Sequence, residues 1–180
     1  MFEVLESVFA ALYNGVISRT NRCLWGGYMY RSAVIQDCEA VYQMICDMES
    51  KMLPYDQFRR IFQRQLEDVR YDCIICEENE KTIGVLNLRY EEQLHHSETI
   101  AEIMEFVIAA GYRREGHGKD MLAYASQRAK EKGCTQIEVA CNQLRKDTHR
   151  FYLREGMNNY HFKFSKRLTE LDSCENVLGR

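Results

Sequence analysis

The feature that most constrains this chain is a glycine-containing turn at residues 113–118, which separates an apolar run from a helix-like segment. The apolar run covers residues 103–108, and residues 119–122 (Lys-Asp-Met-Leu) are typical of a helix. An order of strand, turn and helix leaves backbone N–H groups without partners at the start of the helix, where the helix dipole also favours negative charge. A phosphate or pyrophosphate can bind there if glycine lets it approach the main chain. The turn therefore indicates either a phosphate site or an ordinary strand-to-helix connection.

A second motif, later in the chain, helps to distinguish these alternatives. The turn reads Arg113, two residues, Gly116, one residue, Gly118, and residues 151–156 read Phe-Tyr-Leu-Arg-Glu-Gly. Both motifs, in this order, resemble those of the Gcn5-related N-acetyltransferase (GNAT) superfamily, in which the turn binds acetyl-CoA. The resemblance implies an α/β GNAT fold, with a mixed central sheet of about six or seven strands and about four flanking helices. Acetyl-CoA is the co-substrate that it implies.

Acetyl transfer to an amine needs a group that keeps the nitrogen neutral and a group that protonates the departing thiolate. The resemblance implies Glu102 as the base, acting through water, and Tyr152 as the acid. A solvent-facing glutamate and a core tyrosine are the structural alternatives. Glu105 is the rival carboxylate, but strand geometry with a period of two residues places it on the opposite face from Glu102. The implied contacts to acetyl-CoA are Phe106, Val107, Ile108, Arg113, Arg114, Glu115, Gly116, His117, Gly118, Lys119, Asn142 and Phe151.

Further segments resemble one subgroup, the bacterial aminoalkylphosphonate N-acetyltransferases. They are residues 94–96 (Leu-His-His), residues 147–156 and residues 161–164, within a similarity from about Tyr30 to Leu168. The resemblance implies acetylation of the primary amine of a small molecule, with an aminoalkylphosphonate as the candidate acceptor. A protein, peptide or aminoglycoside acceptor, or a non-catalytic acyl-CoA-binding regulatory domain, are the alternatives. A phosphonate needs cationic partners, and the candidates are Arg59, Arg60, Arg64 and Arg89.

Composition limits the other classes of function. The net charge of −3 and the lack of a clustered basic face argue against nucleic-acid binding. No apolar run approaches the roughly 18 residues of a membrane span. Eight cysteines without paired spacing fit buried apolar positions in a reducing cytosol, so a cytoplasmic location is expected. Cys73 and Cys76 do not predict a metal site, because strand positions three apart face opposite ways. His95 and His96 could bind a divalent ion or the anionic group of the acceptor, or lie on the surface without a role, and on a strand at most one of them would enter the site.

The expected organisation is an extension at residues 1–27, outside the fold, then a GNAT domain at 28–170 and a tail at 171–180. The extension fits a docking helix, a homodimer contact, or residues encoded upstream of the usual start. Asp37, Asp56 and Asp147 are the predicted helix caps. The expected strands cover residues 71–76, 82–88, 98–108 and 135–141, with a first strand near residues 28–33 and a last one in which Tyr160, Phe162 and Phe164 alternate.

Overall fold

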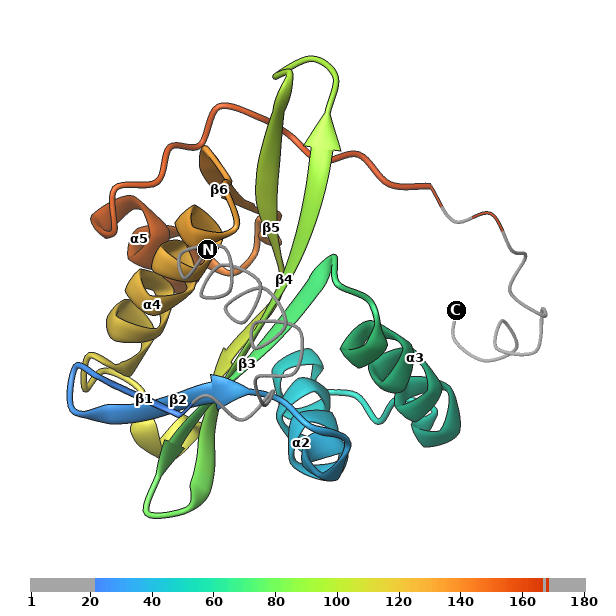
Figure 1. The fold of residues 1–180 in the computed structure, drawn as a ribbon, viewed down its shortest axis with the longest axis vertical. Helices are drawn as coiled ribbons and strands as arrows, with labels where there is room; N and C mark the ends of the chain where they lie inside the picture. Colours follow the sequence, from blue (N-terminus) through green and yellow to red (C-terminus); the bar gives the residue numbers. More distant parts are fainter. Residues whose placement is uncertain (1–21, 167, 169–180) are drawn as a thin grey trace, which may run out of the picture. The chain divides into compact units, whose positions relative to one another are not determined.

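The computed structural model describes residues 22–166 and residue 168. The chain divides into two compact units, Met1–Val139 and Ala140–Arg180, which are taken in turn. In the first unit six strands form one sheet in chain order (Figure 1). All neighbours are antiparallel except β5 and β6, which are parallel. The strands are β1 (Cys23–Trp25), β2 (Tyr28–Ser32), β3 (Tyr71–Glu78), β4 (Lys81–Gln93), β5 (Glu98–Ile108) and β6 (Gln136–Val139).

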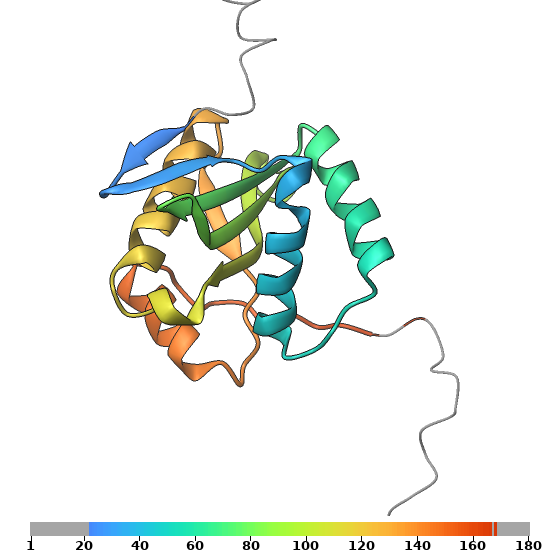
Figure 2. The same cartoon turned by 90° about the horizontal axis from the view of Figure 1, so that it is seen from below.

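In the described part of this unit, three helices cover the two faces of the sheet, as Figure 2 shows. Helices α2 (Cys38–Glu49) and α3 (Tyr55–Glu67) lie on one face, and α4 (His117–Glu131) lies on the other. With α5 (Lys146–Arg154) in the second unit, the described residues contain four α-helices. The mixed sheet of six or seven strands and the four helices expected from the sequence are therefore confirmed.

The face under α2 and α3 holds an apolar cluster built by the alternation of strand side chains. Cys73 and Ile75 of β3 belong to it, together with Val41 and Ile45 of α2 and Phe62 of α3. Cys76 is fully buried outside this cluster, close to Gly84, where an added Cβ would approach Met121 of α4. The two cysteines thus occupy opposite faces, as the strand period requires. Cys38, Cys46 and Cys134 are buried as well, in agreement with the prediction of small buried side chains.

Strand β1 lies inside the range that the sequence assigned to an extension. It pairs with β2 from Cys23↔Tyr30 to Trp25↔Tyr28. The ring of Trp25 also meets Tyr124 of α4 edge to face, at 5.9 Å between centroids. Within the described residues, the sheet includes Cys23–Trp25, which precede the expected boundary at residue 28. Residues 1–21 of the expected extension lie outside the described part of the chain.

The three predicted aspartate caps do not cap their helices. Asp37 precedes α2, but no side-chain cap bond forms, because its carboxylate accepts hydrogen bonds from the guanidinium of Arg31 at 2.6 and 2.7 Å. Helices α3 and α5 begin two residues earlier than expected, after Pro54 and Arg145, so the other two aspartates lie in the first helical turn. There a carboxylate still interacts favourably with the helix dipole.

The second unit contains α5 and a following segment with no regular structure. Gly156 ends the helix region at φ +82°, and residues 157–166 form neither helix nor strand. The predicted last strand is therefore wrong. Tyr160, Phe162 and Phe164 alternate, but they are 79%, 76% and 91% exposed. Alternation specifies a strand only where a neighbouring strand and an apolar layer receive it, and residues 157–166 have no strand partner.

Candidate active site

The glycine turn forms an open helix N-terminus. Gly116 precedes α4 with φ +96° and without a side-chain cap, so the first N–H groups of α4 have no partner within the helix. Arg113 closes the turn because its Nε donates to the carbonyl of Ile108 at 2.8 Å. Arg113, Arg114, Glu115 and Gly116 are all exposed. The turn can therefore present backbone donors to an anionic group in solution.

Strands β5 and β6 separate next to this turn. Their parallel ladder runs from Ile100↔Gln136 to Ile103↔Val139, whereas β5 continues to Ile108 along β4. Beyond Ile103, β5 thus has a ladder neighbour in β4 but none in β6. An extended ligand chain can be received beside β5 at such a separation, through main-chain hydrogen bonds of the kind that a strand uses.

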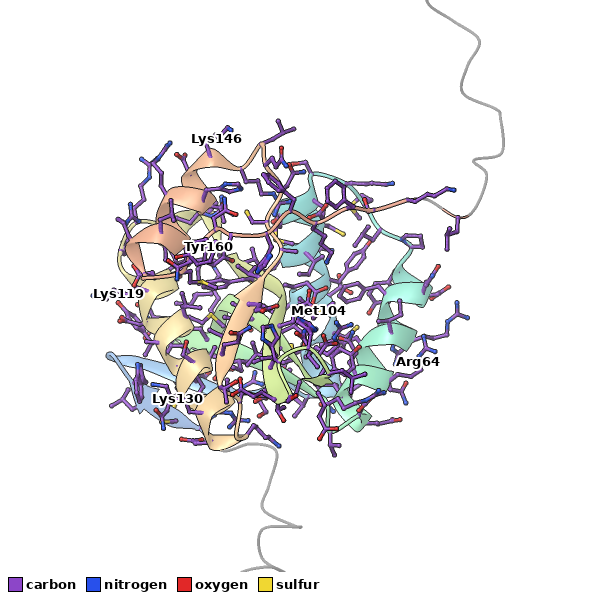
Figure 3. The ribbon with its side chains drawn as sticks, turned by 90° about the horizontal axis from the view of Figure 1, so that it is seen from above. Arg64, Met104, Lys119, Lys130, Lys146 and Tyr160 are labelled. Carbon is purple, nitrogen blue, oxygen red and sulfur yellow. The ribbon has the colours of Figure 1, made fainter. Side chains whose placement is uncertain are left out.

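A β-bulge in β5 lies at the same point. Asn87 pairs with Glu105 and Leu88 with Ile103, so Met104, labelled in Figure 3, is an extra residue opposite β4. Because Arg89 and Asn87 are two residues apart on β4, they share a face, and so do their partners Glu102 and Glu105. The prediction that Glu105 faces away from Glu102 is therefore wrong, since a bulge shifts the period by one residue.

Glu102, the expected base, belongs to an ion-paired group. Its carboxylate accepts a 2.6 Å hydrogen bond from Nη2 of Arg89. The same guanidinium contacts Glu91 at 2.7 Å. Arg89 is about one-third exposed and Glu102 about one-fifth, so both groups can be reached from solvent. Arg89 thus holds the carboxylate of Glu102 in place, and two carboxylates already offset the charge of Arg89.

Glu105 has a different environment on the same face. One carboxylate oxygen accepts a 2.8 Å hydrogen bond from the amide of Asn87, which also donates to Gln65 of α3 at 2.9 Å. Burial raises the pKa of Glu105, and the Asn87 hydrogen bond opposes part of this shift. Gln65, Asn87 and Glu105 form a chain from α3 to β5 that the sequence analysis did not identify, because no motif records a contact between α3 and the bulge.

The side chains of some expected acetyl-CoA contacts point into the protein. His117 is 1% exposed, and its ring packs against that of Tyr28 with 4.2 Å between the ring centroids. Val107 belongs to the apolar cluster under α2. These residues can contribute main-chain groups only. Lys119 lies on the outer side of α4 (Figure 3) and is exposed, as expected for a side chain that meets a phosphate. Phe106, Ile108 and Gly118 are partly buried.

The remaining expected residues lie in the second unit. Asn142 shapes the segment before α5, where its side-chain oxygen accepts the N–H of Leu144 at 2.9 Å. Phe151 and Tyr152 lie on α5 with their rings 5.2 Å apart. Tyr152 is 8% exposed, and burial raises its pKa well above the usual range of a phenol. The hydroxyl therefore keeps its proton at neutral pH.

The other candidate side chains lie elsewhere in the first unit. Arg59 lines an open pocket of about 460 Å³ between residues 33–36, which precede α2, and α3. Arg60 is exposed, and Arg64 points from α3 into solvent (Figure 3). His95 and His96 lie in the β4–β5 turn rather than on a strand, with their rings 4.1 Å apart. The described part of the chain contains no group of three metal-ligating side chains and no helix able to span a membrane.

Comparison with known proteins identifies the class that this fold and turn define. The sequence profile of the Acetyltransferase (GNAT) family matches residues 38–157. The chain is 36% identical over 138 residues to an aminoalkylphosphonate N-acetyltransferase of Salmonella typhimurium. The aligned region covers 77% of this chain and 90% of the Salmonella protein. The chain belongs to the GNAT family of acetyltransferases.

Solved structures agree on the fold. A transcriptional regulator from Bacillus halodurans superposes with a TM-score of 0.72 at 24% identity, over 78% of this chain and 99% of that one. Glucosamine-6-phosphate N-acetyltransferase from Arabidopsis thaliana gives a TM-score of 0.67 at 18% identity, over 79% and 99% of the two chains. Both likenesses concern the fold alone.

Proposed function

We propose that this acetyltransferase uses acetyl-CoA to acetylate the primary amine of a small molecule, and that its acceptor is an aminoalkylphosphonate. The observation that carries the proposal is the separation of β5 from β6 after Ile103, beside an open helix N-terminus and two carboxylates on one face of β5. The similarity to the Salmonella protein supports the choice of acceptor.

The residues at the turn suit acetyl-CoA. The left-handed φ of Gly116 and the open space where its Cβ would lie favour close approach of a pyrophosphate to the main chain. Arg113, Arg114 and Lys119 would add positive charge at the phosphates, and the main chain at residues 106–108 would hold the pantetheine arm. When bound, acetyl-CoA supplies the acetyl group as a thioester.

Two side chains have proposed protonic roles. Glu102, fixed by Arg89, accepts a proton from the amine through water. Tyr152 donates its hydroxyl proton to the CoA thiolate, and its raised pKa keeps it a donor across the neutral range.

The face of β5 that carries Glu102 suits the ammonium end of an acceptor. Glu91 and Glu102 contact the cation Arg89 there, and Glu105 adds a third carboxylate. Since Arg89 is already paired twice, a phosphonate would be bound by a different cation. Charge on this face therefore selects the amine, and the acidic end of the substrate must lie away from it.

The acceptor is tested by comparing kcat/KM for aminomethylphosphonate, 2-aminoethylphosphonate, a lysine-rich peptide and an aminoglycoside in the same buffer. We expect the two aminophosphonates to react fastest. A peptide or aminoglycoside that is better by about tenfold, or 1.4 kcal/mol, would contradict the phosphonate assignment. If none of these amines is acetylated, the proposed acetylation of a small-molecule amine would be contradicted.

The role of Tyr152 is tested by Tyr152→Phe, with Tyr160→Phe as the matched control on an exposed ring in the same unit. Because the ring remains while the proton donor is removed, kcat should fall roughly 10²-fold to 10⁴-fold for Tyr152→Phe. Acetyl-CoA affinity should be unchanged, and the control should retain wild-type turnover. Equal turnover in the two variants would exclude Tyr152 as the acid.

A further inference from the structure

A small amine is an ammonium ion at neutral pH, so two protons must leave its nitrogen during acetylation. The proposed function provides one carboxylate, Glu102, for this purpose. The bulge at Met104 brings a second, Glu105, to the same face of the sheet and to the part of β5 that has left β6. Both carboxylates therefore border the place where the reaction is proposed to occur.

Among the residues that the structure describes, no cation forms an ion pair with Glu105. Asn87 contacts it from β4, and Gln65 follows from α3. Arg89 is two residues from Asn87 on the same face, but it contacts Glu91 and Glu102. Cys73 of β3 is a neutral thiol, because burial raises its pKa and the charge of Glu105 adds to that shift. Helix α2 presents the apolar side chains of Met44 and Met48 to this face.

These contacts give the two glutamates different chemistry. A carboxylate that accepts a hydrogen bond from a guanidinium, as Glu102 does from Arg89, is held in position beside a cation. A partly buried carboxylate with only an amide donor binds a proton more readily, and Glu105 is of this kind, since burial raises its pKa. A base whose pKa lies closer to the working pH is the more effective proton acceptor.

We propose that Glu105 is a second catalytic base of the proposed acetyl transfer, and that it takes the first proton from the bound ammonium. This inference rests on the proposed function. The ammonium loses a proton to Glu105 and becomes a neutral amine, whose lone pair forms the N–C bond to the acetyl carbon. The second N–H proton passes through water to Glu102 as the C–S bond breaks, and the thiolate takes the hydroxyl proton of Tyr152. Tyr152 recovers one proton, so one proton ends on the thiol and one in solvent.

The decisive variants are Glu105→Gln and Asn87→Asp, with Glu92→Gln as the control for loss of an exposed carboxylate on β4. In Glu105→Gln, kcat/KM for the amine should fall at least about tenfold, and the acidic limb of its pH profile that reports Glu105 should disappear. In Asn87→Asp, the amide donor is lost and a like charge appears, so the acidic limb should move to higher pH. Glu92→Gln should match the wild type in both respects.

A measurement that does not depend on turnover distinguishes a change at Glu105 from a general loss of activity. The carboxyl-carbon NMR signal of Glu105, assigned by its absence in Glu105→Gln, should titrate above the range of the exposed glutamates, and higher still in Asn87→Asp. An ordinary titration of Glu105, or unchanged acidic limbs in both variants of an active enzyme, would overturn the role of Glu105 and leave the acetyltransferase function intact. A wild-type protein that acetylates no amine would overturn the proposed function instead.

Discussion

Two polar clusters on the α2 and α3 side of the sheet, one buried and one partly buried, differ in how their charges are matched. In the first, Arg31 donates to both oxygens of Asp37 at 2.6 and 2.7 Å and to Glu77 at 2.6 Å. In the second, Glu105 receives a neutral amide donor from Asn87. The first cluster joins β2, β3 and the start of α2 through charge-assisted hydrogen bonds. The second leaves a carboxylate whose protonation can change.

The comparison shows what distinguishes a structural carboxylate from a candidate catalytic one in this protein. Asp37 is buried and Glu105 is partly buried, and both accept hydrogen bonds, but from partners of different charge. The guanidinium of Arg31 brings a positive charge to Asp37, whereas the amide of Asn87 brings none to Glu105, whose pKa is raised by burial. Glu102 is intermediate, because Arg89 binds it in a more exposed setting.

The largest expected effect comes from breaking the matched cluster. In Arg31→Met, Asp37 would remain buried without a cation and Glu77 would keep only its 3.6 Å contact with the exposed Arg22, so the free energy of unfolding should fall by about 3–5 kcal/mol. Denaturant titration measures this loss. Arg70→Met removes an exposed arginine that pairs with Asp68, so it should leave the melting temperature almost unchanged. Equal losses in the two variants would show that charge matching in the Arg31 cluster is unimportant.

A smaller effect is expected from substituting the glycines at the two ends of α4, of which only Gly116 has a proposed role in binding. Gly116 and Gly133 have φ of +96° and +82°, and an added Cβ at either would meet open space. Gly116→Val and Gly133→Val should therefore lose similar stability from the same backbone strain, about 1–2 kcal/mol. Gly116→Val alone should also weaken acetyl-CoA binding at least about tenfold, or 1.4 kcal/mol. Calorimetry showing equal acetyl-CoA affinity for both variants would exclude the turn as the binding site.

The smallest expected effect is a pH-dependent change in stability in the unmatched cluster. Because the pKa of Glu105 is raised from 4.5 in the folded protein, the stability that its protonated form contributes is present below that value and is lost as the pH rises through the raised pKa. Glutamine stays neutral throughout. The stability of Glu105→Gln relative to wild type should therefore increase between pH 4 and pH 8. A constant difference between the two unfolding free energies would contradict a raised pKa for Glu105.

Several features could be predicted from the sequence because local patterns specify them. Strand β5 has the expected bounds of residues 98–108, because its apolar run is long and a turn lies at each end of it. Gly116 takes the left-handed conformation that the turn motif needs. The sequence did not predict the first described strand, because Cys23–Trp25 is short. This strand is held in the sheet by pairing with β2 and by the contact between the rings of Trp25 and Tyr124. The last strand was overpredicted because an alternating pattern does not reveal whether a partner is present.

The sequence by itself determined the family of the chain, because the glycine turn and the later aromatic motif depend on backbone freedom and residue type over short spans. Only the tertiary structure decided which carboxylates share a face. One extra residue in β5, Met104, shifts the alternation of side chains by one residue, so that Glu105 lies on the same face of the sheet as Glu102. A bulge depends on the register with the neighbouring strand, and the proton affinity of Glu105 depends on burial and on Asn87 across that ladder. Neither is a property of the local sequence, because both arise from contacts between strands that meet only in the folded sheet.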